Sequence, residues 1–139
     1  MKIKLVVSSA VLFLSINIMM AQTKAGNDKD EHGCRASAGY TFSVIKNECI
    51  RVFEQEVKLD EVNPGTSSSI AAVIFSDDKT KAEVFIPSIR GGVILLRTGN
   101  EGNYGWKKGK ISLLDKGKEG YILLKKKKII YKSPLITGG

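Results

Sequence analysis

Apolar and polar residues alternate with a period of two along much of the chain after residue 40. In residues 81–87, KAEVFIP, one set of alternate positions carries alanine, valine and isoleucine. Residues 69–76, SIAAVIFS, form a more continuous apolar run, and the polar sequence DDKT at 77–80 separates the two segments. Because successive side chains of a strand point to opposite faces, this pattern predicts a β-hairpin over residues 69–87.

A second pair of strands is predicted nearer the N-terminus. Residues 40–45 and 49–54 are rich in aromatic and β-branched side chains, and the polar residues 46–48 separate them. Such residues on both sides of a short polar break indicate a hairpin. A helix from Phe42 to Glu56 is the alternative interpretation.

The rest of the chain contains further short apolar segments between turn-forming residues. The turn signals are Asn63-Pro64-Gly65, Gly91-Gly92, the glycine-rich residues 98–105, and Gly117 to Gly120. Strand-like segments cover 93–97, 106–116 and 120–133, with a bulge or bend expected at Gly109. About seven to eight short strands at regular spacing predict an all-β fold, a small antiparallel β-barrel or sandwich.

The first part of the chain reads as a targeting segment. Residues 1–21 open with two lysines, continue as an apolar run broken by serines and end in alanine, which is typical of a cleaved secretory signal peptide. A membrane anchor is the alternative, but the apolar run is short for one. We expect a flexible leader at 22–33, one β domain at 34–133 and a tail at 134–139. The protein is therefore expected in the bacterial periplasm or outside the cell, with no transmembrane segment after signal removal.

The cysteines and the single histidine restrict the chemistry of the chain. Cys34 and Cys49 form an even pair in an exported protein, which predicts one disulfide rather than two free thiols. A loop of this length contributes about 3 kcal/mol on the chain-entropy model. With His32 as the only histidine, no metal site is expected.

Little in the sequence indicates catalysis. His32 lies in the polar leader, so no nucleophile has a well-placed base. The carboxylates fall mostly in turns, where aspartate forms local hydrogen bonds; they are Asp60, Glu61, Asp77, Asp78, Glu83, Glu101 and Asp115. The glycine-rich residues 98–105 do not open a helix and are not a phosphate loop. We therefore expect a protein that is not an enzyme and needs no cofactor.

The 22 lysines and arginines exceed the 14 acidic residues and give the chain a net charge of +8, and removing Lys2 and Lys4 with the signal leaves +8 − 2 = +6. Four lysines are consecutive, at 125–128. Such a run can end one strand and start the next, form a bulge, or protect an exposed sheet edge. Export argues against nucleic acid as a partner. Adhesion to an anionic envelope surface through the lysines is one functional hypothesis.

The N-terminal part of the predicted domain resembles a motif of small exported bacterial proteins, most of them uncharacterised. The motif reads C-x-x-S-A-G-Y-x-[WF]…C-x-R. Its positions here are Cys34, Ser37, Ala38, Gly39, Tyr40, Phe42, Cys49 and Arg51. The resemblance supports export and a disulfide but implies no activity.

Residues 71–131 resemble the periplasmic and membrane-bound inhibitors of C-type lysozyme, which are small exported β-barrels. The segment Trp106-Lys107-Lys108-Gly109 matches their aromatic-x-Lys-Gly element, and Tyr104 matches a loop tyrosine. Thr98-Gly99 is among the nearest equivalents of the family's Ser-Gly, whose serine has no match here, and the family's cysteines are missing. The resemblance implies that Lys108, helped by Thr98, Tyr104 and Trp106, enters the acidic cleft of a C-type lysozyme or another cell-wall hydrolase.

The position of Trp106, the only tryptophan, decides between two forms of this segment. On a regular strand, Trp106 faces the same way as Lys108 and opposite to Lys107. If Trp106 belongs to the core, a bulge is expected to free Lys108, because burying a lone charge is costly. Otherwise both residues stand in a solvent-facing loop.

Overall fold

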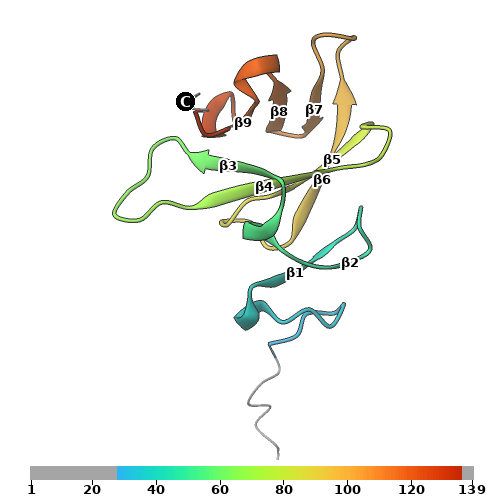
Figure 1. Ribbon diagram of the computed structural model, residues 1–139, viewed down its shortest axis with the longest axis vertical. Helices are drawn as coiled ribbons and strands as arrows, with labels where there is room; N and C mark the ends of the chain where they lie inside the picture. The colour runs from blue at the N-terminus through green and yellow to red at the C-terminus, as the bar shows by residue number, and fades with distance from the viewer. Residues whose placement is uncertain (1–27, 136–139) are drawn as a thin grey trace, which may run out of the picture.

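The computed structural model describes residues 28–135 and shows a closed antiparallel β-barrel with a separate hairpin beside it (Figure 1). The barrel strands are β3 (Val57–Glu61), β4 (Ile70–Phe75), β5 (Lys81–Phe85), β6 (Gly92–Thr98), β7 (Gly105–Lys108), β8 (Ile111–Asp115), β9 (Tyr121–Lys125) and β10 (Lys128–Lys132). The hairpin consists of β1 (Tyr40–Ser43) and β2 (Glu48–Arg51), and the 3-10 helices are η1 (Ala36–Ala38), η2 (Val52–Glu54) and η3 (Gly117–Glu119). The prediction of an all-β barrel or sandwich is confirmed, and the fold is the barrel.

Each barrel strand pairs with the next one in the chain, and β10 closes the barrel by pairing with β3. The closing contact is short: Tyr131 lies opposite Glu61, and Lys132 lies opposite Asp60. Closure leaves no free strand edge in the barrel. The lysines at 125–128 therefore protect no sheet edge, which excludes one of the three interpretations of this run.

Alternation along the strands fills the barrel with apolar side chains. The register places Trp106 opposite Leu113, Leu113 opposite Leu123, and Leu123 opposite Tyr131, all pointing inward. The core also contains Leu59, Ala71, Val73, Ala82, Val84, Ile86 and Leu95. These are the side chains that a period of two assigns to one face of each strand.

The segment that begins at β1 forms a hairpin, so the alternative of a helix from Phe42 to Glu56 is wrong. The predicted disulfide joins Cys34 to Cys49 on β2 and ties the preceding arm to the hairpin. Gly39 has a φ of +81°, which favours glycine. Tyr40 lies opposite Arg51, whose guanidinium stands 4.5 Å from the centre of the tyrosine ring. These contacts give the cysteine-bounded motif a structural role.

Residues 28–33, which we expected within a flexible leader, are instead held against the hairpin. Lys29 forms a β-bridge with Arg35, and the Asp30 carboxylate accepts hydrogen bonds from the backbone N–H groups of His32 and Cys34. The His32 ring stacks on Phe42 at 3.8 Å. The predicted signal peptide, residues 22–27 of the predicted leader and residues 136–139 of the predicted tail lie outside the described residues.

The hairpin covers the outer face of β4 and β5. Ile50 packs there against Ala72, Ile74 and Phe85, which point away from the barrel interior. This second apolar cluster explains why the segment 69–76 is apolar on both faces. Its alternate residues serve two different cores.

Glu83 lies between the hairpin and the barrel and is completely buried. Its carboxylate accepts hydrogen bonds from the Ser43 hydroxyl at 2.7 Å and from the backbone N–H groups of Val44 and Ile45 at 2.9 and 3.1 Å. Gly92 leaves the space that this carboxylate needs, since a Cβ there would lie 2.5 Å from a Glu83 oxygen. Glu83 therefore fastens the β1–β2 turn to the barrel wall.

Candidate functional site

The four residues implied by the lysozyme-inhibitor resemblance do not form one site. Thr98 and Tyr104 flank the β6–β7 connection at one end of the barrel, whereas Lys108 ends β7 at the opposite end. Four residues of extended strand separate Tyr104 from Lys108 by roughly 13 Å. Tyr104 is half-buried, and the Arg97 guanidinium lies 4.8 Å from its ring centre. The residues of the proposed inhibitory surface are therefore divided between two ends.

Trp106 is a core residue with 2% of its surface exposed. Its indole N–H donates a 2.8 Å hydrogen bond to the Lys79 carbonyl in the β4–β5 turn, and its ring packs against Phe75 at 4.9 Å. A partner cannot contact this buried side chain, so Trp106 is not one of the residues that could bind a lysozyme directly.

Lys108 reaches solvent without the bulge that a core Trp106 was expected to require. The β7–β8 register is regular, with Trp106 opposite Leu113 and Lys108 opposite Ile111. Lys108 points to the same side as Trp106, but it is the last residue of its strand. Its ammonium therefore leaves the barrel through the rim and avoids the cost of burial.

The lysine-rich end of the barrel is the end that carries the β7–β8 and β9–β10 turns. It is defined by seven exposed lysines: Lys107, Lys108, Lys110, Lys125, Lys126, Lys127 and Lys128. Lys108 lies opposite Ile111, Ile111 opposite Lys125, and Lys125 opposite Lys128, so one cross-strand row holds three of them. Two runs separated by 14 residues of sequence thus become one surface.

Tight turns produce this convergence. Gly109 and Lys110 connect β7 to β8, and Gly109 has a positive φ of 58°. Lys126 and Lys127 connect β9 to β10 and both have positive φ, which two-residue hairpin turns require. The run of four lysines therefore ends one strand and starts the next. The Lys126 N–H donates to the Lys110 carbonyl at 2.9 Å, and this bond joins the two turns.

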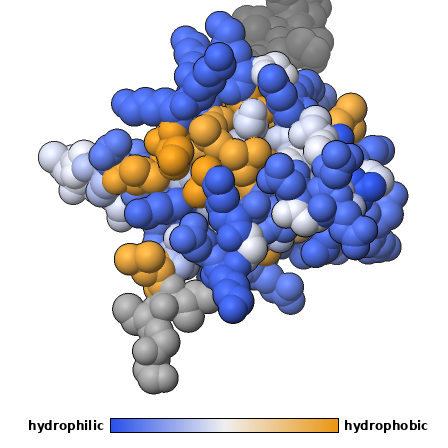
Figure 2. Space-filling view, turned by 90° about the horizontal axis from the view of Figure 1, so that it is seen from above, coloured by the Kyte–Doolittle hydropathy of each residue, from blue (hydrophilic) through white to orange (hydrophobic). Residues whose placement is uncertain are grey.

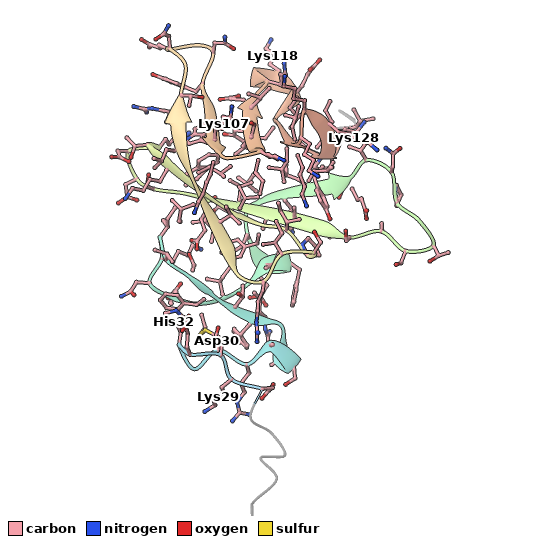
Figure 3. All side chains as sticks on the ribbon, turned by 180° about the vertical axis from the view of Figure 1, so that it is seen from behind. Lys29, Asp30, His32, Lys107, Lys118 and Lys128 are labelled. Carbon is pink, nitrogen blue, oxygen red and sulfur yellow. A yellow bond between two sulfur atoms is a disulfide. The ribbon has the colours of Figure 1, made fainter. Side chains whose placement is uncertain are left out.

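The charges at this end are almost all positive. Across residues 28–135, none of these seven lysines makes an ion pair within 4.0 Å. Glu61, at the same end of the barrel, accepts hydrogen bonds from the Ser69 N–H and hydroxyl. The opposite end mixes both signs, with Asp77, Asp78, Glu101, Asp115 and Glu119 beside Lys79, Arg97, Lys116 and Lys118. Lys107 and Lys128 lie far from Lys29, Asp30 and His32 (Figure 3).

The shifted titratable groups serve turns and the core. The Thr80 backbone N–H, helped by the Thr80 and Ser76 hydroxyls, lowers the pKa of Asp78 to about 2 and so supports the β4–β5 turn. Burial raises the pKa of Tyr121, and the charge of Asp115 adds to this effect. A backbone hydrogen bond from Cys34 lowers the pKa of Asp30 despite partial desolvation. None of these groups lies at the lysine-rich end.

Two further properties concern metals and membranes. Within the described part of the chain, no three His, Cys, Asp or Glu side chains come close enough to hold a metal ion. No helix between residues 28 and 135 has the length and apolar character needed to cross a bilayer.

The fold defines a small closed antiparallel β-barrel with a disulfide-linked hairpin on its wall and a lysine-rich end. Comparisons with protein-family models, with curated proteins and with solved structures gave no match.

Sequence reasoning identified Lys108 and the run at 125–128 but not their proximity. A signal was present, because a strand-length segment on each side of Gly109 and on each side of Lys126-Lys127 predicts two consecutive hairpins. In a series of sequential antiparallel strands, every second turn lies at the same end of the sheet. The β7–β8 and β9–β10 turns therefore come together. Strand β3 was also not identified as a separate strand.

Proposed function

We propose that the protein is an exported, non-enzymatic binding protein that holds an anionic partner against the lysine-rich end of its barrel. The observation that carries this proposal is the convergence of seven exposed lysines without a carboxylate paired to them. Like charges at such short spacing repel one another and oppose folding. An anionic surface or polymer relieves that repulsion, because every lysine that meets an anion also releases counterions.

The affinity for an anionic partner is expected to depend on where the lysines lie and not only on the net charge of the protein. In the matched test, Lys108, Lys110 and Lys127 are replaced by glutamine in one variant, and Lys79, Lys116 and Lys118 in the other. Both variants lose three charges, and each contains one turn lysine with positive φ. Binding of long-chain polyphosphate to residues 22–139 is measured by calorimetry at about 50 and 200 mM salt.

We expect the wild-type affinity to fall steeply with salt, because the Debye length shortens from about 14 to 7 Å over this range. The first variant is expected to lose at least about tenfold in affinity and the second no more than about threefold, since each lysine near an anionic surface contributes about 1 kcal/mol. Equal losses in both variants, or binding that salt does not affect, would contradict the proposal.

A second candidate function is inhibition of a C-type lysozyme by the β7–β8 turn. One observation favours it: Lys108 is exposed next to a two-residue turn that a rigid barrel holds in place. A glycosidase cleft presents two carboxylates, and one ammonium can pair with them. Since Thr98 and Tyr104 lie at the other end, such an interface depends on the turn alone.

Lysozyme inhibition by residues 22–139 tests this candidate. Lys108→Ala is expected to weaken inhibition about 100-fold, because removing one partner of a buried charge pair costs about 2–5 kcal/mol. Lys118→Ala, at the opposite end, is expected to leave inhibition unchanged. Full lysozyme activity at equimolar wild-type protein rejects this candidate and leaves the first one standing.

A further inference from the structure

The outer face of the barrel beside the lysine-rich end carries uncovered apolar side chains. Following the register from β6 to β10, one row of outward-facing residues consists of Leu96, Lys107, Ser112, Leu124 and Ile129. Leu114 and Ile122 face outward in the adjacent row. An apolar area bordered by hydrophilic side chains is visible in the view from above (Figure 2).

This outer face differs from the one beneath the hairpin. On β4 and β5, the outward-facing Ala72, Ile74 and Phe85 are buried because β1 and β2 cover them. On the β6–β10 side, by contrast, 58% of Leu96 and 40% of Ile129 are exposed. We call this β6–β10 surface the open face.

The open face contains a shallow groove whose lining combines apolar and cationic groups. Ser112, Leu114 and Leu124 lie between the two hairpins, and the groove is otherwise lined by Lys107, Gly109, Lys110, Lys126 and Lys127. No carboxylate lines it. An occupant that matches this surface must offer negative charge at its rim and apolar material at its centre.

We propose that the open face docks on an anionic lipid bilayer, with lysines on the phosphate groups and leucines among the upper acyl chains. This inference rests on the proposed function and specifies the partner of the same lysine-rich end. Lysine side chains suit such a position because their stems lie along apolar surface while the ammonium stays in water. Shallow insertion of apolar side chains combined with basic residues is the usual mode of interfacial binding.

The other occupants match the surface less well. A second copy of the chain would bring a second set of unpaired lysines against the first, and like charges repel. A soluble acidic polymer would satisfy the lysines but leave the central leucines in water. Only the bilayer satisfies both chemistries at once.

The test uses variants matched by exposure. Leu96→Ser combined with Ile129→Ser removes apolar groups from the open face. Val44→Ser combined with Ile70→Ser removes similar groups elsewhere, since the exposed fractions are 58% and 40% in the first pair and 61% and 41% in the second. Residues 22–139 are used, because the apolar segment 1–21 would itself bind lipid.

Cosedimentation is measured with vesicles of equal parts phosphatidylglycerol and phosphatidylcholine, and with vesicles of phosphatidylcholine alone. We expect the wild-type protein to bind the anionic vesicles only. The Leu96/Ile129 variant is expected to lose about tenfold or more in partitioning, and the Val44/Ile70 variant less than about twofold. Affinity for polyphosphate is expected to be the same for both.

Each other outcome contradicts the inference in a distinguishable way. Vesicle binding that both variants weaken equally, or that neither weakens, means that the open face does not insert. If the wild-type protein binds polyphosphate but not anionic vesicles, the bilayer is rejected as the partner and the proposed function is retained. If it binds neither polyphosphate nor anionic vesicles, the bilayer inference and the proposed function are both rejected. A wild-type dimer that the Leu96/Ile129 variant abolishes identifies a second copy as the occupant.

Discussion

Replacing Trp106 by alanine is expected to lower the free energy of unfolding by about 3–5 kcal/mol. The indole is buried, packs against Phe75 at 4.9 Å and lies 6.2 Å from the ring centre of Tyr121. The substitution opens a cavity between these rings, and the surrounding strands cannot close it because barrel closure fixes their spacing. It also removes the hydrogen bond to the Lys79 carbonyl that holds the β4–β5 turn.

Urea unfolding followed by far-ultraviolet circular dichroism measures this effect, because the variant has no tryptophan fluorescence. Trp106→Phe is the matched control: it keeps an aromatic ring in the cavity but loses the N–H donor, so an intermediate loss is expected. A loss below about 1 kcal/mol for Trp106→Ala contradicts a core position. Such a small loss would instead favour the alternative in which Trp106 stands in a solvent-facing loop.

Replacing Glu83 by alanine is expected to loosen the hairpin from the barrel and to lower the free energy of unfolding by about 3–5 kcal/mol. The reason is the loss of three hydrogen bonds to one buried carboxylate, each with a net value of about 1.5–3 kcal/mol. Relief of the desolvation cost of the carboxylate offsets part of this loss. The backbone N–H groups of Val44 and Ile45 are left without acceptors.

Hydrogen exchange of the Val44 and Ile45 amides gives a local measurement beside global unfolding. Both amides are expected to exchange faster in Glu83→Ala, while amides of β8 and β9 keep their protection relative to global stability. Glu83→Gln keeps the shape with weaker acceptors and is expected to be intermediate. Glu119→Ala, at an exposed turn, is expected to have almost no effect. Unchanged exchange at Val44 and Ile45 would show that Glu83 does not hold the hairpin.

Both variants also separate stability from binding. The side chain of Trp106 points into the barrel core and that of Glu83 lies beneath the hairpin, so variants that remain folded are expected to bind like the wild-type protein. Substitutions at Lys108 or Leu96 change exposed side chains and are expected to leave unfolding almost unchanged. The functional surface and the structural core can therefore be tested independently.

Alternation led to the correct class of fold and placed Ala82, Val84 and Ile86 on one face of their strand, which is the face that points into the barrel core. Glu83 was harder to interpret, because its outward position in β5 is typical of a solvent-exposed residue. It is buried because residues about 40 positions earlier, Ser43 to Ile45, cover it. Alternation along a strand indicates on which face of the sheet a side chain lies, but it does not indicate whether another segment covers that face.

The candidate site shows the same limit. Sequence reasoning identified Lys108 from a four-residue resemblance and joined it to Thr98 and Tyr104, its neighbours in the chain. Neighbours along a strand point to different faces or ends, whereas Lys108, Lys125 and Lys128 meet through strand pairing. The actual companions of Lys108 lie about 20 residues further along.

The sequence by itself determined the strand segments other than β3, the turns and the disulfide, because these depend on residue conformation, short-range alternation and the pairing of two cysteines. Only the tertiary structure decided that β10 closes against β3, that Trp106 is inside, and that two lysine runs form one surface. Closure joins Tyr131 to Glu61 across 70 positions. Contacts of that range depend on the summed twist and register of every intervening strand, which no local pattern specifies.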